Sequence, residues 1–284
     1  FPESIHLRTM LANCDVVTPL TFPDYGINYP AEIYPYRSAL WQKFLVESQG
    51  DSSIIRNIWE GYGAEYATGE PVDLFPIYNN SIRDISDNGY DINDAYKDYA
   101  IWRYFTGDRS LGSSYFNESS YYCESALLNL ENSIDDISIS NKGGTKYVGL
   151  PLNDVNLKLT TQIPEHLKAL YLSIDNNESI NIIDIEINEL EEFLSFNPED
   201  LIEHTIIFYS AYVNLNDNIY FDLELLDYLG GDINFDQDLN VLDVVLLVNF
   251  ALQETFPSSL ELQVGDLNFD GVLNILDVVQ LISQ

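Results

Sequence analysis

The stretch GDLNFDGVLNILDVVQLIS, residues 265–283, decides how the C-terminal end of this chain folds. It occurs almost unchanged once before, as GDINFDQDLNVLDVVLLVNFAL from Gly231, and the equivalent residues Asp232 and Asp266 lie 34 positions apart. In each copy, acids and amides alternate in front of an apolar run, which is typical of a polar loop followed by a helix. We therefore interpret residues 229–284 as an internal repeat of two loop–helix units.

Each loop carries oxygen-bearing groups at positions 1, 3, 5, 7, 9 and 12, counted from its first Asp. Five side chains and the backbone carbonyl at position 7 can surround one hard cation, and Ca²⁺ accepts six to eight oxygens in irregular geometry. Softer metals prefer His or Cys, which this segment lacks. The predicted ligands are Asp232, Asn234, Asp236, Asp238, Asn240 and Asp243 in the first site, and Asp266, Asn268, Asp270, Val272, Asn274 and Asp277 in the second. The sequence thus predicts two Ca²⁺ sites, in which a divalent ion offsets the repulsion between neighbouring acids.

The two loops differ at position 6. The second has Gly271 there, whereas the first has Gln237. Because the sharp turn at this position favours a positive φ, Gln237 is expected to cost about 1 kcal/mol. The first site is therefore predicted to be the weaker one, although Asp238 adds negative charge beside it.

Both loops differ from the EF-hand pattern, because position 12 is Asp and no amphipathic helix is evident before either loop. With these features, residues 229–284 closely resemble the type I dockerin module. The resemblance implies an all-α module of two packed calcium-binding units, metal-dependent folding, and docking onto a cohesin module of another protein. Positions 10 and 11, Val241-Leu242 and Ile275-Leu276, are apolar where many dockerins have small hydroxyl residues, which leaves the partner's identity open.

A purely structural role is the alternative interpretation of these repeats. The apolar residues behind each loop are then the core that joins the two helices, and the ions only hold together a module too small to fold well alone. The residues concerned are Val244, Val245, Leu247 and Val248 in the first copy, and Val278, Val279, Leu281 and Ile282 in the second.

Charge limits the possible partners. The 284 residues include 46 acidic and 12 basic side chains, for a net charge of −34, and no Lys or Arg follows Lys168. We therefore expect no nucleic acid or anionic membrane as a partner of the C-terminal half. No apolar run is long enough for a membrane span. Because the chain starts with Phe1-Pro2, we interpret it as a processed or truncated piece.

Residues 1–125 are predicted to form a helical region. Apolar residues at helical spacing predict helices over 36–45, from about 54 after the cap at 51–53, and from Asp91 or Asn93 to Gly107. Residues 19–35 and 68–76 are expected to be loops. The aromatic residues at helical spacing are expected to lie in the core; they are Trp41, Trp59, Tyr99, Trp102 and Tyr104. Cys14 and Cys123 permit one disulfide but do not require it.

Residues 126–228 change to short β-branched and aromatic runs separated by turn residues, which indicates a β-sandwich. The predicted strands are 146–150, 155–160, 170–174, 180–187, 205–212 and 219–225. Residues 187–196 are a possible helix within this part. The predicted fold is therefore multidomain α+β: a helical region (1–125), a central β-sandwich (126–228) and a C-terminal all-α dockerin with two calcium loop–helix repeats (229–284).

The helical region carries a second resemblance. The strings EIYPYRSALWQKFLVESQGDSSIIRNIWE (32–60) and DAYKDYAIWRYFTGDRSLGSSYF (94–116) are similar to the middle of a group of secreted bacterial zinc metallopeptidases. The resemblance implies an HExxH helix upstream of this chain and a β-domain after the helices. His6, His166 and His204 form no HExxH motif, so no catalytic residue and no peptidase activity is assigned to the chain itself.

Three functions follow from these observations. The first is a secreted bacterial protein, extracellular or attached to a cell surface, whose dockerin binds two Ca²⁺ and tethers an upstream module to a cohesin-like partner. The second is a zinc metallopeptidase whose catalytic segment lies upstream and whose substrate is a peptide. The third is a carbohydrate-binding component of a polysaccharide-degrading system, acting through the β-domain.

Overall fold

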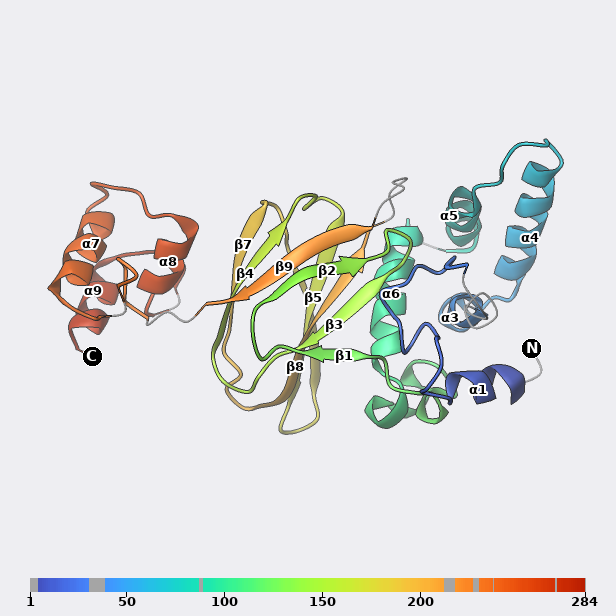
Figure 1. Ribbon diagram of the computed structural model, residues 1–284, viewed down its shortest axis with the longest axis horizontal. Coiled ribbons are helices and arrows are strands. Elements are labelled where there is room, and N and C mark those ends of the chain that lie inside the picture. The colour runs from blue at the N-terminus through green and yellow to red at the C-terminus, as the bar shows by residue number, and fades with distance from the viewer. Residues whose placement is uncertain are drawn as a thin grey trace.

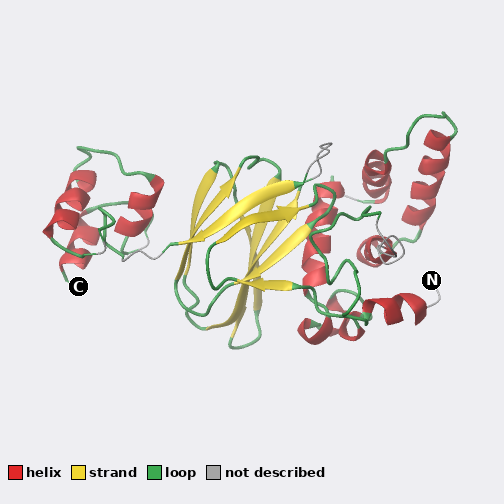
Figure 2. Cartoon of the chain, in the orientation of Figure 1, coloured by secondary structure: helices red, strands yellow, loops and turns green. Residues whose placement is uncertain are grey.

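The computed structural model describes residues 5–30, 39–86, 89–211, 218–226, 230–236, 238–268 and 270–283. Along the longest axis of the molecule, N-terminal helices come first, two β-sheets lie in the middle, and a small helical part follows at the C-terminal end (Figure 1). Helices and strands are thus segregated along the chain (Figure 2). The prediction of a mixed α+β fold is confirmed.

The N-terminal part consists of α-helices and short 3-10 helices. They are α1 (Ile5–Leu11), α3 (Ala39–Gln49), α4 (Ser53–Tyr66), α5 (Leu74–Ile85), α6 (Ile92–Tyr104), η1 (Gly107–Arg109), η2 (Gly112–Ser114) and η3 (Ser119–Tyr121). The helix predicted from Asp91 is α6, which begins with a capping box: the Asp91 carboxylate accepts the Asp94 backbone N–H, and the Asp94 carboxylate accepts that of Asp91. The first three residues of the predicted helix 36–45 lie outside the described residues.

Two of these helices lie where the sequence predicted none. Helix α5 begins within the expected loop 68–76, because the Asp73 carboxylate caps it by accepting the Phe75 N–H. Pro76 falls in the first turn, where its missing N–H costs nothing. Helix α1 is short and was not predicted.

The strands form two sheets. Their bounds are β1 (Leu127–Asn129), β2 (Ile134–Ile139), β3 (Thr145–Gly149), β4 (Val155–Thr161), β5 (Leu167–Asp175), β6 (Ile180–Ile185), β7 (Glu191–Phe196), β8 (Leu201–Ser210) and β9 (Ile219–Leu225). One sheet has the order β1-β3-β8-β5-β6, and the other has the order β2-β9-β4-β7. All pairs are antiparallel except β1 with β3.

A hydrophobic cluster fills the space between the two sheets, as in a β-sandwich. Leu157 and Phe221 enter it from one sheet, and Phe208 from the other. The possible helix 187–196 is wrong, because residues 191–196 are strand β7, paired with β4. Leu194 and Phe196, two positions apart, both pack on this cluster, which is the period of a strand.

The outer face of the five-stranded sheet packs against the helices. Its residues Tyr147, Leu172 and Ile207 belong to the same cluster as the buried helical residues. Arg103 of α6 is buried and donates hydrogen bonds to the carbonyls of Pro19, Pro23 and Gly143 and to the Thr145 hydroxyl. The helical part and the five-stranded sheet therefore share one core.

The aromatic residues of the helices divide into two sets. Trp41, Tyr99 and Tyr104 are buried, as predicted, and Trp102 is half-buried. The expectation was wrong for Trp59, whose side chain is 61% exposed. Helix α4 buries only Ile54 and Ile58, so its second half projects beyond the core.

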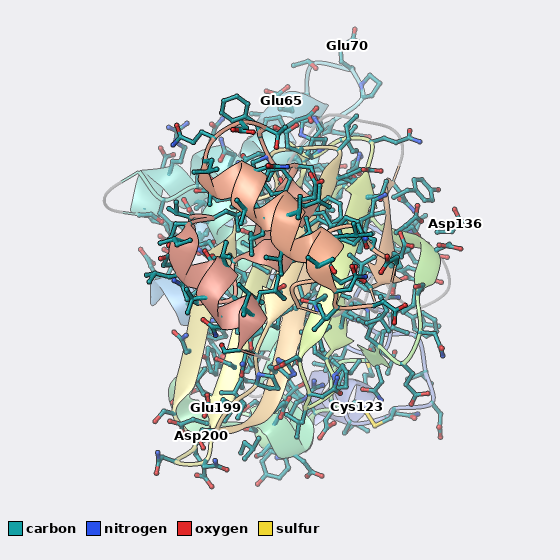
Figure 3. All side chains as sticks on the ribbon, turned by 90° about the vertical axis from the view of Figure 1, so that its left-hand side faces the viewer. Glu65, Glu70, Cys123, Asp136, Glu199 and Asp200 are labelled. Atoms are coloured by element: carbon teal, nitrogen blue, oxygen red, sulfur yellow. A yellow bond between two sulfur atoms is a disulfide. The ribbon has the colours of Figure 1, made fainter. Side chains whose placement is uncertain are left out.

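Cys14 and Cys123 form a disulfide across 109 positions. The Cys123 backbone N–H also donates to the Leu11 carbonyl, so α1 is fastened to the segment that enters the sandwich. In the chain-entropy view, closing a loop of this length removes unfolded-state entropy worth about 4–5 kcal/mol. Cys123 is seen from the C-terminal side in Figure 3.

The C-terminal part contains α7 (Val241–Ala251), α8 (Ser259–Gly265) and α9 (Ile275–Ile282) around a small core that includes Leu247, Val264 and Leu281. The expectation that no helix precedes the loops is wrong for the second loop, which α8 enters directly. Ser258 and Glu261 form a capping box at its start. The pattern Ser-x-x-Glu was the available sequence signal.

Candidate metal centre

The Asp at position 12 of each loop is fully buried and fastens the loop to the helix that follows. Asp243 Oδ1 accepts the N–H of Ile233 at 2.9 Å and that of Asn234 at 3.3 Å, and its Oδ2 accepts the Asn240 N–H at 2.9 Å. Asn240 in turn accepts the Leu242 N–H, and it forms a capping box with Asp243 at the start of α7. Each carboxylate therefore satisfies backbone donors at both ends of its loop.

Asp277 makes the same contacts in the second loop. Its Oδ1 accepts the N–H of Leu267 at 3.0 Å and that of Asn268 at 3.3 Å, and its Oδ2 accepts the Asn274 N–H at 2.9 Å. The two loops are therefore structural copies of each other as well as sequence repeats.

The side chains at positions 1, 3 and 5 form a second layer of hydrogen bonds. In the second loop, the two oxygens of Asp266 accept the N–H groups of Asp270 and Gly271, at 3.0 and 2.7 Å. Asn268 also accepts the Asp270 N–H, and its amide donates to Asp270 Oδ2 at 3.0 Å. In the first loop, Asp232 and Asn234 accept the Asp236 N–H in the same way.

Positions 7 and 9 are joined to the other positions of the loop by the side-chain amide of the Asn at position 9. The Asn274 amide donates both to Asp270 Oδ2, at 3.2 Å, and to the Val272 carbonyl, at 3.1 Å. In the first loop, the Asn240 amide donates to the Asp238 carbonyl at 3.0 Å. The structure thus joins positions 1, 3, 5, 7, 9 and 12 of each loop in one local hydrogen-bond network.

Hydrogen bonds from the Asn268 side chain and the Val272 backbone N–H lower the pKa of the Asp270 carboxyl. This favours the ionised form that a cation needs. Across the described parts of the chain, however, no three His, Cys, Asp or Glu side chains gather as a metal-binding group. Half of the predicted ligand set in each loop is amide or backbone carbonyl oxygen, and the position-12 carboxylates are engaged by backbone N–H groups. The twelve assigned ligands therefore stay a prediction.

Gly271 has φ +81°, and a Cβ built on it would meet no atom within 4 Å. Its conformation, and not lack of space, makes glycine favourable here. Gln237, the equivalent residue, lies outside the described residues.

The apolar residues behind the loops divide between core and surface. Leu247, Val278 and Leu281 are buried in the core that joins the helices. Val245, Val279 and Ile282, expected in that core, are instead more than half exposed, because they lie on the outer faces of α7 and α9. Positions 10 and 11 are exposed too: Val241 (69%), Leu242 (56%), Ile275 (63%) and Leu276 (58%).

Residues 230–284 match the family of the dockerin type I domain. This module is a type I dockerin domain. The prediction drawn from the repeat is thereby confirmed for the C-terminus, whereas the resemblance of residues 1–125 to metallopeptidases stays a prediction. None of the curated proteins matches the chain.

Among solved structures, the chain is similar to the pre-peptidase C-terminal domain of collagenase from Bacillus anthracis. The identity is 10%, the TM-score is 0.27, and the match covers 35% of this chain and 92% of that chain. A likeness at this score defines neither a fold nor a function.

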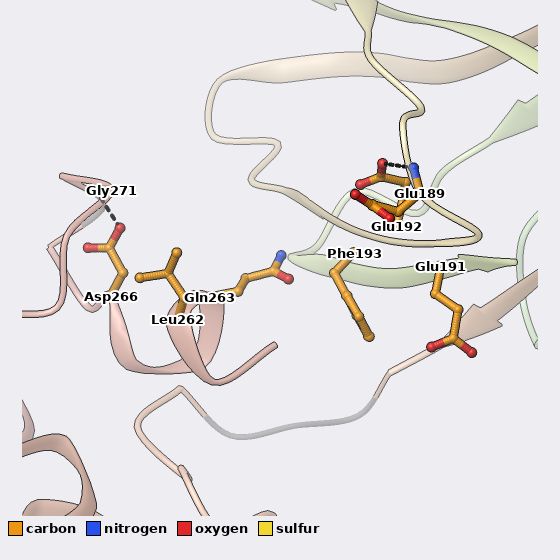
Figure 4. A pocket seen from close by; sticks show the side chains of 8 residues that line it. All are labelled: Glu189, Glu191, Glu192, Phe193, Leu262, Gln263, Asp266 and Gly271. Atoms are coloured by element: carbon orange, nitrogen blue, oxygen red, sulfur yellow. Dashed lines mark hydrogen bonds between the residues drawn. The ribbon is translucent and has the colours of Figure 1, made fainter. Parts of the chain in front are cut away.

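The dockerin meets the sandwich through α8. The Gln263 side-chain amide donates to the Ser195 hydroxyl of β7, and a hollow of about 280 Å³ lies beside this contact. Glu189, Glu191 and Glu192 line it from the sandwich, and Leu262 and Asp266 from the dockerin (Figure 4). The outer faces of α7 and α9 take no part in this hollow.

His204 and His166 each lie in separate surroundings in the sandwich. His204 is buried in β8, where Nδ1 lies 3.0 Å from the Tyr171 hydroxyl and Nε2 lies 2.8 Å from the Pro151 carbonyl. His166 lies 3.6 Å from the carboxylate of its neighbour Glu165. In the described residues, no helix is both long and apolar enough to span a membrane.

Proposed function

We propose that this chain binds two Ca²⁺ ions in its dockerin and docks, in a calcium-dependent way, onto a cohesin-type module of another protein. The modules that precede the dockerin are then the cargo that docking tethers. The observation that carries this proposal is the pair of equivalent loops, each followed by a helix with an exposed apolar face.

Calcium binding is supported by the chemistry of the loops. In the second loop, the amides of Asn268 and Asn274 both donate to Asp270 Oδ2, so two partial positive charges converge on one carboxylate oxygen. A half-turn of both amides presents their oxygens in place of their nitrogens. The loop then offers oxygens alone, as Ca²⁺ requires.

Docking is supported by the outer surface of α7 and α9. Val241, Leu242 and Val245 on α7 correspond to Ile275, Leu276 and Val279 on α9, and all six are more than half exposed. The whole segment 230–284 contains no Lys or Arg. Exposed apolar groups of this density on a small module indicate a protein interface whose partner presents apolar groups.

Secretion is supported by two observations. Disulfides persist in oxidising compartments, and the chain contains the Cys14–Cys123 bond. Millimolar calcium outside cells also suits loops of this kind. We therefore assign the protein to the extracellular side, with attachment through the docking partner.

The test is binding of the full chain to a panel of immobilised type I cohesin modules, with Ca²⁺ and with EDTA. We expect one or more modules to bind in Ca²⁺ and to release the chain in EDTA. The double variant Leu242→Asp/Leu276→Asp should abolish binding, because it places a charge at the equivalent position of both helices. The matched control Leu152→Asp, at an exposed site on the sandwich, should bind normally. Binding that is unchanged in the double variant contradicts this docking face.

A further inference from the structure

Helix α4 presents a row of three aromatic rings, of which the two outer ones are exposed and the middle one, Tyr62, packs partly against the helical core. Trp59, Tyr62 and Tyr66 follow one another at i, i+3 and i+7, on a single helical face. The Trp59 and Tyr66 side chains are 61% and 68% exposed, and Tyr62 is partly exposed between them. A Cβ built on Gly63, on the same face, would meet no atom within 4 Å. Trp59 and Tyr66 are therefore open to solvent, and Tyr62 joins them as a partly exposed ring.

The rings form a ladder with a regular repeat. The centroids of Trp59 and Tyr62 are 6.1 Å apart, and those of Tyr62 and Tyr66 are 5.9 Å apart. The two tyrosine rings are nearly parallel, at 19°, whereas Trp59 meets Tyr62 at 78°. The three rings thus follow one another along the helix at nearly equal spacing, with one change of ring orientation between Trp59 and Tyr62.

The surroundings of the row are polar and mostly acidic. Exposed Arg56, Glu60 and Glu65 flank it on α4, and Glu70 follows in the next loop. Glu65 and Glu70 lie at the outer edge of the molecule in Figure 3. Negative charge in excess excludes an anionic ligand and opposes pairing of two copies of this face.

The row is also too narrow for a stable protein interface. Such an interface buries about 800 Å² on each partner, around a central apolar cluster. Here, charged and small residues replace apolar ones immediately beside the three rings. A chain-like ligand, one ring wide, fits this shape better than a second globular surface.

We propose that the row formed by Trp59, Tyr62 and Tyr66 binds a neutral, linear polysaccharide. The ladder repeats at about the length of one pyranose unit, so successive sugar rings can place their C–H faces on successive aromatic rings. Arg56, Glu60 and Glu65 stand beside the row as donor and acceptors for sugar hydroxyls. This site lies on α4, away from the dockerin, and does not depend on docking.

The experiment is titration of the full chain with hexasaccharides of β-1,4-linked glucose, xylose and mannose, followed by tryptophan fluorescence and calorimetry. Trp59 is a suitable reporter because Trp41 is buried and Trp102 is half-buried. At least one hexasaccharide should bind and change the emission. Trp59→Ala and Tyr66→Ala should each weaken that binding about tenfold, as expected for loss of one stacked ring.

The control variant is Phe256→Ala, which removes an aromatic ring that is 88% exposed on the dockerin and should leave affinity unchanged. Because Trp59 and Tyr66 are exposed, their variants should keep the unfolding midpoint of the parent chain. Absence of binding to all three sugars at millimolar concentration overturns the proposal, as does binding that Trp59→Ala leaves intact. An Arg-rich decapeptide that binds through the row where the sugars do not would also overturn it, in favour of a basic protein segment.

Discussion

Asp243 and Asp277 occupy the position at which the resemblance to calcium loops assigns a metal ligand, and in the structure they also hold the loop backbone. Each is buried and accepts three backbone N–H groups. A carboxylate has lone pairs enough for both tasks. The shorter Asp, in place of the Glu of an EF-hand, is a predicted metal ligand and is also part of the capping box of the next helix.

Replacing Asp277 separates these two roles. Asp277→Ala leaves one buried and two partly buried N–H groups without this acceptor, which costs about 2–3 kcal/mol of dockerin stability even in EDTA. Asp277→Asn keeps an acceptor but loses the charge, so its defect should appear mainly as lost Ca²⁺ affinity. Thermal melts in EDTA and in Ca²⁺, read by circular dichroism, compare the two. Equal stability of Asp277→Ala and the parent chain in EDTA contradicts the backbone role.

Among the helices and strands, the sequence predicted those that are specified by neighbouring residues, such as a helix cap or a run of β-branched residues. The cap at Asp91 and the apolar spacing behind it located α6, and short β-branched and aromatic runs located β4 and β9. Strand β7 was mistaken for a possible helix because its pairing with β4, through residues far apart in sequence, outweighs local propensity.

At the candidate site too, only features set by residues close together in sequence could be predicted. The repeat predicted the place of both loops, because their spacing is contained within twelve residues. The ligands assigned to them stay a prediction. Exposure of Val245 and Val279, and of Trp59, could not be predicted from periodicity. Helix α7 is apolar on most sides, so its sequence shows no direction toward the core. In α4 and α9, the packing against other elements decides how much of the apolar face is covered.

The two loops differ chiefly at position 6, which is Gln237 in the first and Gly271 in the second. Exchanging these two residues tests how position 6 affects Ca²⁺ affinity. Gly271→Gln should weaken the second site and Gln237→Gly should strengthen the first, each by about 1 kcal/mol or roughly fivefold in Kd, because L-residues resist positive φ. Calorimetric titration with Ca²⁺ measures both constants. Ser283→Ala, outside the loops, is the control. A weaker second site in the parent chain would contradict the assigned order.

At the scale of the whole molecule, the parts have different means of stabilisation. The helical part and the five-stranded sheet share one core and are fastened by the disulfide. The dockerin has a small separate core and contacts β7 through Gln263. We therefore predict that the stability of the dockerin depends on Ca²⁺, and that the stability of the rest of the chain does not. The proposed docking face on α7 and α9 and the aromatic row on α4 lie at opposite ends of the molecule (Figure 1). A partner bound to one of them therefore leaves the other accessible.

The most direct test of the central claim is calorimetric titration of the full chain, stripped of metal with EDTA and dialysed, with CaCl₂. We predict two bound ions per chain and one in the double variant Asp266→Ala/Asp277→Ala, because this variant removes two ligands of the second loop only. Absence of binding at millimolar Ca²⁺, or full stoichiometry in the double variant, would contradict calcium binding by the loops at residues 232–243 and 266–277.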